Sequence, residues 1–202
     1  LHAYDADKIN KEIIVRNAKE GEIFEALDNR KYKLKKDMCV ISDKSGVLGL
    51  GGIIGGTTTS TEIDTKNILL EAAYFRPSSI RKTARSLNIN TDAKYRFERG
   101  IDPNSIKEGL ELATELILKI CGGEASKFQI SGKANQKNKI INFQVEKFEK
   151  LIGISITANE IDKILLSLGF KCKKNQKVIK VEVPSWRPDV SLDEDLIEEL
   201  IR

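Results

Sequence analysis

The chain has 202 residues, of which 40% are hydrophobic and 32% are charged, and its formal net charge is +4. This composition is typical of a globular protein with one large core or two smaller ones, and it excludes a chain that is disordered throughout. No apolar run could span a membrane and no signal peptide is recognisable, so we expect a cytoplasmic protein without membrane contact.

The two ends and the cysteines give further expectations. The chain starts at Leu1 without a methionine and ends at Arg202 inside a predicted helix, so we expect a piece of a longer polypeptide. The three cysteines are far apart and form no CxxC pair, which argues against a disulfide framework or a zinc site. We therefore expect buried thiols at Cys39, Cys121 and Cys172.

The first 75 residues predict strands joined by turns. In chain order we expect short strand-like pieces mixed with turns (1–32), an apolar strand (38–41), a turn (43–46), an apolar glycine-rich stretch (47–56), a polar loop (57–62) and a buried strand (68–75).

Two helices are expected next. Pro77 suits the first turn of a helix whose apolar face carries Ile80, Ala84 and Leu87. The second helix is predicted to have Asp102 as its N-cap and Pro103 at its first position, and to stop at residues 122–123. Its apolar stripe consists of Ile106, Leu110, Ala113, Ile117 and Ile120.

The polar stretch between Ser131 and Asn138 indicates a domain boundary, so we expect one domain over residues 1–132 and another over residues 133–202. In the second domain we expect a helix over 143–151, followed by a helix that begins with a capping box of Thr157 and Glu160. A hairpin is expected after these helices, formed by 170–173 and 178–183 across Asn175 and Gln176. The predicted fold class is α+β, with a mixed first domain and a small second domain similar to a winged helix.

Charge is distributed unevenly along the chain. Residues 76–99 carry seven basic and two acidic side chains, and residues 133–180 carry eleven lysines and four acids. Residues 189–199 carry six acids and no base. Charge alone leaves polyanion contact and cation binding open, with a solvated face as the alternative for each run.

Three features of the first domain are candidates for chemistry. The stretch 47–56 lacks a P-loop ending and a GxGxxG at a helix start, so we reject nucleotide binding; its glycines suit close approach of a substrate or a tight turn. His2, the only histidine, has no nucleophile signature beside it. Glu71 interrupts an apolar strand and needs a hydrogen-bond partner, which is either a ligand hydroxyl or amine or a buried arginine.

The acidic run at the end of the chain suits Mg²⁺. Asp195, Glu198 and Glu199 share one face of a predicted helix, and Asp189 just before it can converge on the same point. The alternative is that these acids favour the helix dipole, with Arg202 paired to Glu198 or Glu199.

Several segments carry a family resemblance: LHAYD (1–5), GIIGG (52–56), LEAAYF (70–75), IRKTAR (80–85) and TDAKYRFERGIDP (91–103). In order and spacing they resemble the B3/B4 region, which carries the editing site, of the bacterial phenylalanyl-tRNA synthetase beta chain. The later PSWRPD (184–189) and DLIEEL (195–200) are similar to the B5 module of the same chain.

The resemblance implies an intact enzyme that joins phenylalanine to tRNA(Phe) with ATP and Mg²⁺, as a heterotetramer with an alpha subunit that holds the synthetic site. ATP is then a substrate of the whole enzyme and does not bind this chain. This chain would hydrolyse tyrosine wrongly attached to tRNA(Phe), because a pocket for phenylalanine rejects one added hydroxyl by only about 10²-fold.

The resemblance also implies roles for residues at matching motif positions. Glu71 would recognise the phenolic hydroxyl of tyrosine, and His2 would orient the ester or the attacking water, without a covalent intermediate. The editing pocket would be lined by Gly52, Gly55, Gly56, Thr91 and Ala93, with backbone N–H groups of the glycine run holding the substrate carbonyl.

Mg²⁺ would bind Asp189, Asp195, Glu198 and Glu199 at a site shared with the alpha subunit. The candidates for contact with tRNA are Arg81, Lys82, Arg85 and Arg96. The resemblance further implies that the earlier part of the B3/B4 domain is missing before Leu1. The alternative function is a non-catalytic scaffold and nucleic-acid-binding module, in which replacing Glu71 would reduce stability rather than alter discrimination.

Overall fold

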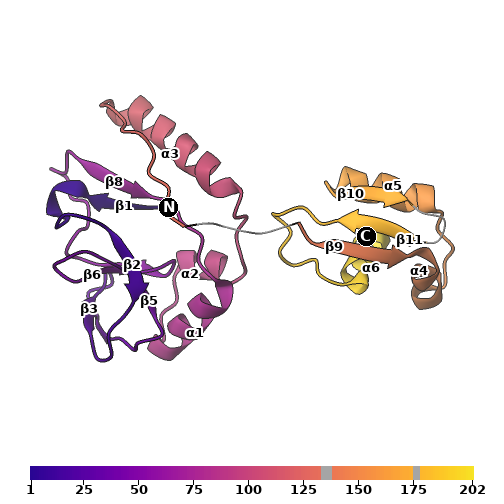
Figure 1. Cartoon of the computed structure of the whole chain (residues 1–202), viewed down its shortest axis with the longest axis horizontal. Coiled ribbons are helices and arrows are strands. Elements are labelled where there is room, and N and C mark those ends of the chain that lie inside the picture. Colours follow the sequence, from indigo (N-terminus) through magenta and orange to yellow (C-terminus); the bar gives the residue numbers. More distant parts are fainter. Residues whose placement is uncertain (133–137, 175–177) are drawn as a thin grey trace. The chain divides into compact units, whose positions relative to one another are not determined.

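The computed structural model describes residues 1–132, 138–174 and 178–202. The chain forms two compact units, Leu1–Ile101 with Ser105–Gly132 and Asp102–Asn104 with Lys133–Arg202 (Figure 1). Helices and antiparallel strands occur in both, which confirms the α+β class. The polar stretch expected to separate the domains lies largely in residues 133–137, outside the described residues. No helix in the described ranges is long and apolar enough to cross a membrane.

The first unit is built on antiparallel strands. Its four-stranded sheet has the order β2 (Ile14–Asn17), β5 (Cys39–Ser42), β6 (Val47–Leu50) and β7 (Ile54–Gly55). Two further pairs are β3 (Ile23–Glu25) with β4 (Lys31–Lys33), and β1 (His2–Asp5) with β8 (Ile68–Glu71), and a 3-10 turn Ala6–Lys8 follows β1. The strand expected over 68–75 therefore ends at Glu71.

Helices α1 (Pro77–Leu87) and α2 (Asp92–Phe97) follow β8 and lie next to each other (Figure 1). Pro77 occupies the first turn of α1 as predicted, where the missing N–H of proline costs no helical hydrogen bond. Ile80 and Ala84 are buried in the same core as Val40 and Leu50 of the sheet. The apolar face of α1 thus fixes this helix against the strands that carry the glycine run.

Helix α3 (Ser105–Cys121) begins later than predicted. The carboxylate of Asp102 accepts a hydrogen bond from the Asn104 N–H at 2.9 Å, so it closes a turn before the helix and is not its N-cap. No residue of α3 is buried, although the predicted stripe is apolar. Residues on α3 such as Leu112 and Ile120 are 57% and 79% exposed.

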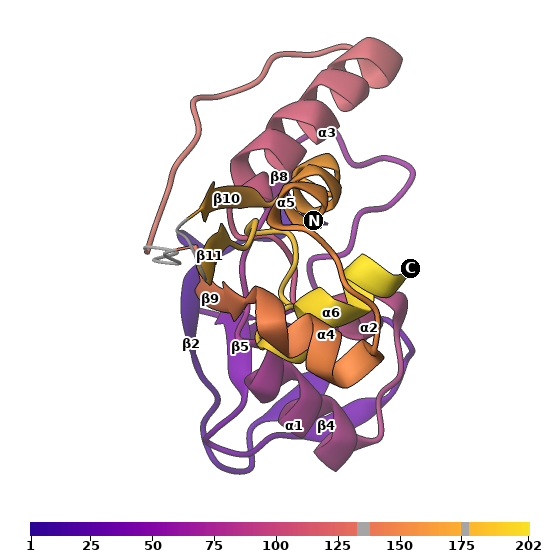
Figure 2. The same cartoon turned by 90° about the vertical axis from the view of Figure 1, so that its right-hand side faces the viewer.

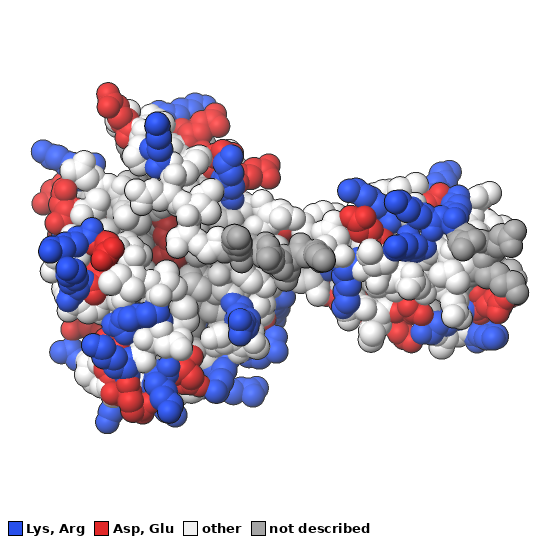
Figure 3. Space-filling view, viewed as in Figure 1, with Lys and Arg blue, Asp and Glu red and all other residues white. Residues whose placement is uncertain are grey.

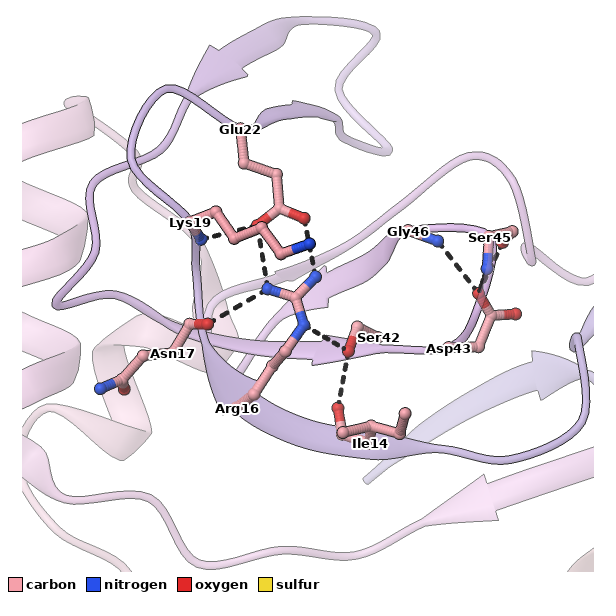
Figure 4. A network of polar contacts seen from close by, with 9 residues as sticks. All are labelled: Ile14, Arg16, Asn17, Lys19, Glu22, Ser42, Asp43, Ser45 and Gly46. Carbon is pink, nitrogen blue, oxygen red and sulfur yellow. Dashed lines mark hydrogen bonds and ion pairs between the residues drawn. The ribbon is translucent and has the colours of Figure 1, made fainter.

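An arginine joins three parts of the first unit (Figure 4). Arg16 on β2 donates two hydrogen bonds to Glu22, at 2.9 and 2.7 Å, and one to Ser42 Oγ on β5 at 3.0 Å. The Ser42 hydroxyl in turn donates to the Ile14 carbonyl at 2.9 Å. The hydrogen bonds from Arg16 hold the pKa of Glu22 below its usual range. These contacts attach the edge strand β2 to the sheet.

The second unit has a three-stranded antiparallel sheet of order β10 (Lys171–Lys174), β11 (Val178–Glu182) and β9 (Ile140–Gln144), visible in Figure 2. The helices are α4 (Val145–Ile152), α5 (Ala158–Ser167) and α6 (Asp193–Ile201). The capping box of Thr157 and Glu160 is present as predicted. Phe143, however, lies in β9 opposite Ile179 rather than in a helix.

The core of the second unit explains the hairpin. Ile179 and Val181 of β11 are fully buried, while Lys180 between them is exposed, because successive side chains of a strand point to opposite faces. The turn expected at Asn175 and Gln176 lies outside the described residues.

All three cysteines are free thiols, but Cys121 is exposed, so the prediction of burial is wrong for that residue.

Candidate functional site

A pocket opens in the first unit where four separated segments meet. These are β1, the turn between β6 and β7, the chain from the end of β8 to Phe75, and α2. The pocket has a volume of about 70 Å³ and opens to solvent at its mouth. Figure 3 shows this unit hollowed near β1 and β8, with acidic atoms deep in the hollow. Of the seven predicted editing residues, those that line the pocket are His2, Gly52, Gly55, Glu71 and Ala93.

The register of β1 and β8 places His2 directly opposite Glu71. Glu71 is half-buried, as expected of a carboxylate in an apolar strand, and Oε2 accepts a hydrogen bond from the Tyr4 hydroxyl at 2.6 Å. The partner that Glu71 needs is thus a phenol from the chain itself, and the expected alternative of a buried arginine is wrong. The rings of His2 and Tyr4 meet edge to face, with centroids 4.5 Å apart.

Burial controls the protonation of this group of residues. Burial lowers the pKa of His2, against the opposing effect of the negative charge of Glu71, so the imidazole is neutral at pH 7. Burial and the carboxylate of Glu71 both raise the pKa of Tyr4 far above its usual value. Tyr4 therefore keeps its proton and donates to Glu71, while neutral His2 is able to donate or accept a hydrogen bond.

The glycine run forms a tight turn between β6 and β7 and also lines the pocket. Gly52 has a φ of +69°, and a Cβ there would lie 2.8 Å from the ring of Phe75, so the turn requires glycine. The N–H groups of Gly51 and Ile53 donate to carbonyls of the chain. Within the described residues, no hydrogen bond is made by the Gly52 N–H, and Gly52 lines the pocket.

Two predicted pocket residues support the walls instead of lining them. A Cβ on Gly56 would lie 2.7 Å from the Leu48 carbonyl, so this glycine permits close approach of neighbouring backbone segments. Thr91 caps α2: its hydroxyl accepts from the Lys94 N–H at 3.1 Å and donates to the Ile53 carbonyl at 2.7 Å. Thr91 thereby attaches α2, with Ala93, to the glycine turn.

Sequence reasoning assigned no role to Tyr4. The signal was present, because Tyr4 is two residues from His2, and alternate residues of a strand share one face. Its hydroxyl partner could not be read from the pattern, because Glu71 is 67 residues away.

The four basic residues predicted to contact tRNA are all exposed. Arg81, Lys82 and Arg85 line a shallow depression along α1. Arg81 also donates to the Glu98 carbonyl at 3.0 Å, and Lys82 forms an ion pair with Asp37 at 2.5 Å. The depression presents three cations to solvent, while Arg96 lies on α2 and does not line it.

Two of the acids predicted to bind Mg²⁺ share an arginine. Arg187 Nη2 lies 2.6 Å from Asp189 and 2.7 Å from Glu199. The hydrogen bonds from Arg187 hold the pKa of Asp189 below its usual range. Both carboxylates are thus neutralised by a side chain of the same unit.

The other two acids are also engaged. Asp195 accepts hydrogen bonds from the Ser191 and Leu192 N–H groups at 2.6 and 2.8 Å, at the start of α6. Glu198 pairs with Arg202 at 3.1 Å, which confirms the pairing expected as the alternative. In the described part of the chain, no three His, Cys, Asp or Glu side chains form a group that could hold a metal ion. The acids do not fit a Mg²⁺ site built from this chain alone.

Family models and known proteins similar to this chain agree with one another. Residues 1–122 match the B3/4 domain family, and residues 141–202 match the tRNA synthetase B5 domain family. The chain is 43% identical to the phenylalanine–tRNA ligase beta subunit of Mesorhizobium japonicum and 44% identical to that of Rhodopseudomonas palustris. Both alignments cover 100% of this chain and 25% of the relative, so the chain spans about a quarter of the length of these relatives.

A solved structure is also similar. It is an N-terminal fragment of the phenylalanyl-tRNA synthetase beta subunit from Pyrococcus horikoshii, with 20% identity and a TM-score of 0.47. The match covers 99% of this chain and 58% of that one.

Proposed function

Because this chain belongs to the B3/4 domain family and continues into a B5 domain, as in phenylalanine–tRNA ligase beta subunits, we propose that its first unit hydrolyses tyrosyl-tRNA(Phe). The family resemblance indicated by the motifs is confirmed by these matches. The proposal adds a reaction, the removal of a wrongly attached tyrosine, and assigns it to the pocket of His2 and Glu71.

One observation carries the proposal: the carboxylate at the pocket already accepts a hydrogen bond from a phenol. The Tyr4 hydroxyl binds Oε2 of Glu71 at 2.6 Å, and Oε1 accepts no hydrogen bond within the described residues. A carboxylate has about four lone-pair positions, so a second phenol can bind the free oxygen. Phenylalanine offers no hydroxyl there and gains no such bond.

The remaining pocket groups suit ester hydrolysis by water. Neutral His2 is able to orient a water molecule or the terminal ribose of tRNA by hydrogen bonding. The N–H of Gly52, which lines the pocket, would donate to the ester carbonyl as negative charge develops on its oxygen. The described pocket lining includes no serine or cysteine nucleophile, so water held close to the ester is the expected attacking group.

The tRNA would be held by exposed cations. Arg81, Lys82 and Arg85 on α1 suit contact with phosphates, and Figure 3 shows basic side chains gathered over β10 and β11 of the second unit. Lys173 and Lys180 are exposed and directly opposite in that hairpin, a like-charge pair that a bound phosphate would stabilise.

The whole enzyme proposed here joins phenylalanine to tRNA(Phe) in the cytoplasm, uses ATP and Mg²⁺, and pairs the beta subunit with an alpha subunit as a heterotetramer. The names of the relatives, phenylalanine–tRNA ligase beta subunits, support the use of ATP and Mg²⁺, the tRNA and the alpha-subunit partner.

The test is deacylation of tyrosyl- and phenylalanyl-tRNA(Phe) by the chain and by its Glu71→Ala variant. We expect the chain to release tyrosine selectively, and the variant to lose about tenfold of that selectivity, because the hydrogen bond to the phenol is lost. Circular dichroism checks that both fold.

Glu115→Ala is the matched control, because Glu115 is exposed on α3 and does not line the pocket. It should retain full selectivity. A folded chain that releases neither amino acid would contradict the proposal and would favour the alternative of a non-catalytic scaffold and nucleic-acid-binding module.

A further inference from the structure

Tyr4 is held in one position by its surroundings. Its side chain is 2% exposed, its ring meets His2 edge to face, and its hydroxyl would lie 3.8 Å from a Cβ placed on Gly49. A buried hydroxyl needs an acceptor, and the contact it makes is with Oε2 of Glu71 at 2.6 Å. The hydroxyl is thus a fixed donor aimed at one oxygen of the pocket carboxylate.

Glu71, in contrast, is tethered by a flexible side chain at the end of β8. It is half-buried, and the Tyr4 hydroxyl is the donor that the structure gives to its carboxylate. A glutamate without a fixed partner populates several rotamers, and ordering it on binding would weaken recognition of a ligand. Because the two oxygens belong to one planar carboxylate, the donor that binds Oε2 also fixes the direction of Oε1.

We propose that Tyr4 is a positioning residue whose hydroxyl holds Glu71 so that the second carboxylate oxygen faces the phenol of a bound tyrosyl group. This inference rests on the proposed function, because it concerns how the same pocket selects tyrosine. Tyr4 itself needs no contact with the substrate; it acts through Glu71. The selectivity of the pocket then depends on a pair of residues from β1 and β8 rather than on Glu71 alone.

Binding of L-tyrosinamide and L-phenylalaninamide to the full chain, measured by isothermal titration calorimetry, tests the inference. Tyr4→Phe deletes one oxygen and retains the ring that packs on His2. We expect the affinity ratio of the two ligands to fall about fivefold in this variant, the effect of one lost hydrogen bond.

A matched control separates positioning from stability. Tyr32 donates to Asp28 Oδ2 at the same 2.6 Å, in the same unit and outside the pocket lining. Tyr32→Phe should reduce the stability of the unit to a similar degree and leave the affinity ratio unchanged. A purely structural role of Tyr4 would give the same result for both variants.

A second variant covers the case in which Tyr4→Phe does not fold. Glu71→Asp retains the charge but withdraws the carboxylate from Tyr4, so it should reduce the ratio to a similar extent. Where Tyr4→Phe does fold, combining it with Glu71→Asp should cause little further loss, because the two residues act as one unit.

The outcomes separate the two proposals. If the wild-type chain prefers L-tyrosinamide and Tyr4→Phe reduces the affinity ratio of the two ligands, both the proposed function and the inference are supported. A selective wild-type chain whose affinity ratio is unchanged in Tyr4→Phe but falls in Glu71→Asp overturns the inference and leaves the proposed function standing. A wild-type chain that does not prefer L-tyrosinamide counts against the proposed function and overturns the inference with it.

Discussion

Glu71 in the first unit and Glu199 in the second are both acids that the sequence marks as functional, and the structure treats them differently. Glu71 meets a neutral phenol and faces a pocket. Glu199 meets the guanidinium of Arg187, 12 residues away, and its side chain is 13% exposed.

The difference shows that closeness in sequence does not make a binding site. The acids around α6 are near neighbours in the chain, and nearby cations and backbone N–H groups satisfy them. The pocket of Glu71 combines segments that are tens of residues apart, and no cation neutralises its carboxylate within the described residues. An acidic side chain is available to a ligand where the fold places no cation or backbone N–H group beside it.

The largest effect is expected from the backbone that forms the pocket wall. Gly56→Ala would push a Cβ to 2.7 Å from the Leu48 carbonyl, and backbone cannot move aside easily. We expect a loss of about 3 kcal/mol in the free energy of unfolding of the first unit. Urea unfolding followed by far-UV circular dichroism measures it.

The adjacent Gly55→Ala is the control for Gly56→Ala. Its Cβ would overlap the ring of His2, 2.6 Å from Nε2, and this ring is able to swing away. We expect a smaller loss of stability but loss of tyrosine selectivity. The fluorescence of Trp186, the only tryptophan, reports the second unit and should be unchanged in both variants. A wild-type unfolding midpoint for Gly56→Ala would contradict this account.

A middle-sized effect is expected where the acids are neutralised. Arg187→Met leaves the largely buried carboxylate of Glu199 without its cation, which should cost the second unit about 2 kcal/mol. Urea unfolding followed by Trp186 fluorescence measures the change.

Arg202→Met is the exposed counterpart, since Arg202 and its partner Glu198 are 73% and 59% exposed. It should cost less than about 0.5 kcal/mol. Equal losses for Arg187→Met and Arg202→Met would show that the pairing of Glu199 does not matter for stability.

The smallest effect is a change in the titration of His2. Burial lowers its pKa below the usual 6.5, and the charge of Glu71 opposes this shift. Neutral His2 therefore contributes stability that is complete above pH 6.5 and is lost as pH falls through the lowered pKa of the folded state. Glu71→Gln removes the opposing charge, so the pKa of His2 should fall further.

The single histidine makes this measurement direct by NMR of the imidazole carbon-bound protons. Glu25→Gln on β3 is the control and should leave the titration of His2 unchanged. A rise in the pKa of His2 in Glu71→Gln would show that the two side chains do not interact as the structure places them.

Features that depend on near neighbours could be predicted from sequence. Pro77 at a helix start and the capping box of Thr157 with Glu160 involve contacts within three residues, and both are confirmed. Phe143 was predicted in a helix and lies in a strand, because its pairing with Ile179 in β11 outweighs local preference.

The candidate site divides in the same way. The motifs by themselves determined which residue types belong together, and five of the seven predicted editing residues line one pocket. Tertiary structure alone decided that Gly56 and Thr91 support the walls, that Tyr4 binds Glu71, and that Arg187 binds Glu199. The physical reason is that a side chain's partner depends on distance and burial in three dimensions, whereas a motif records only residue type and spacing.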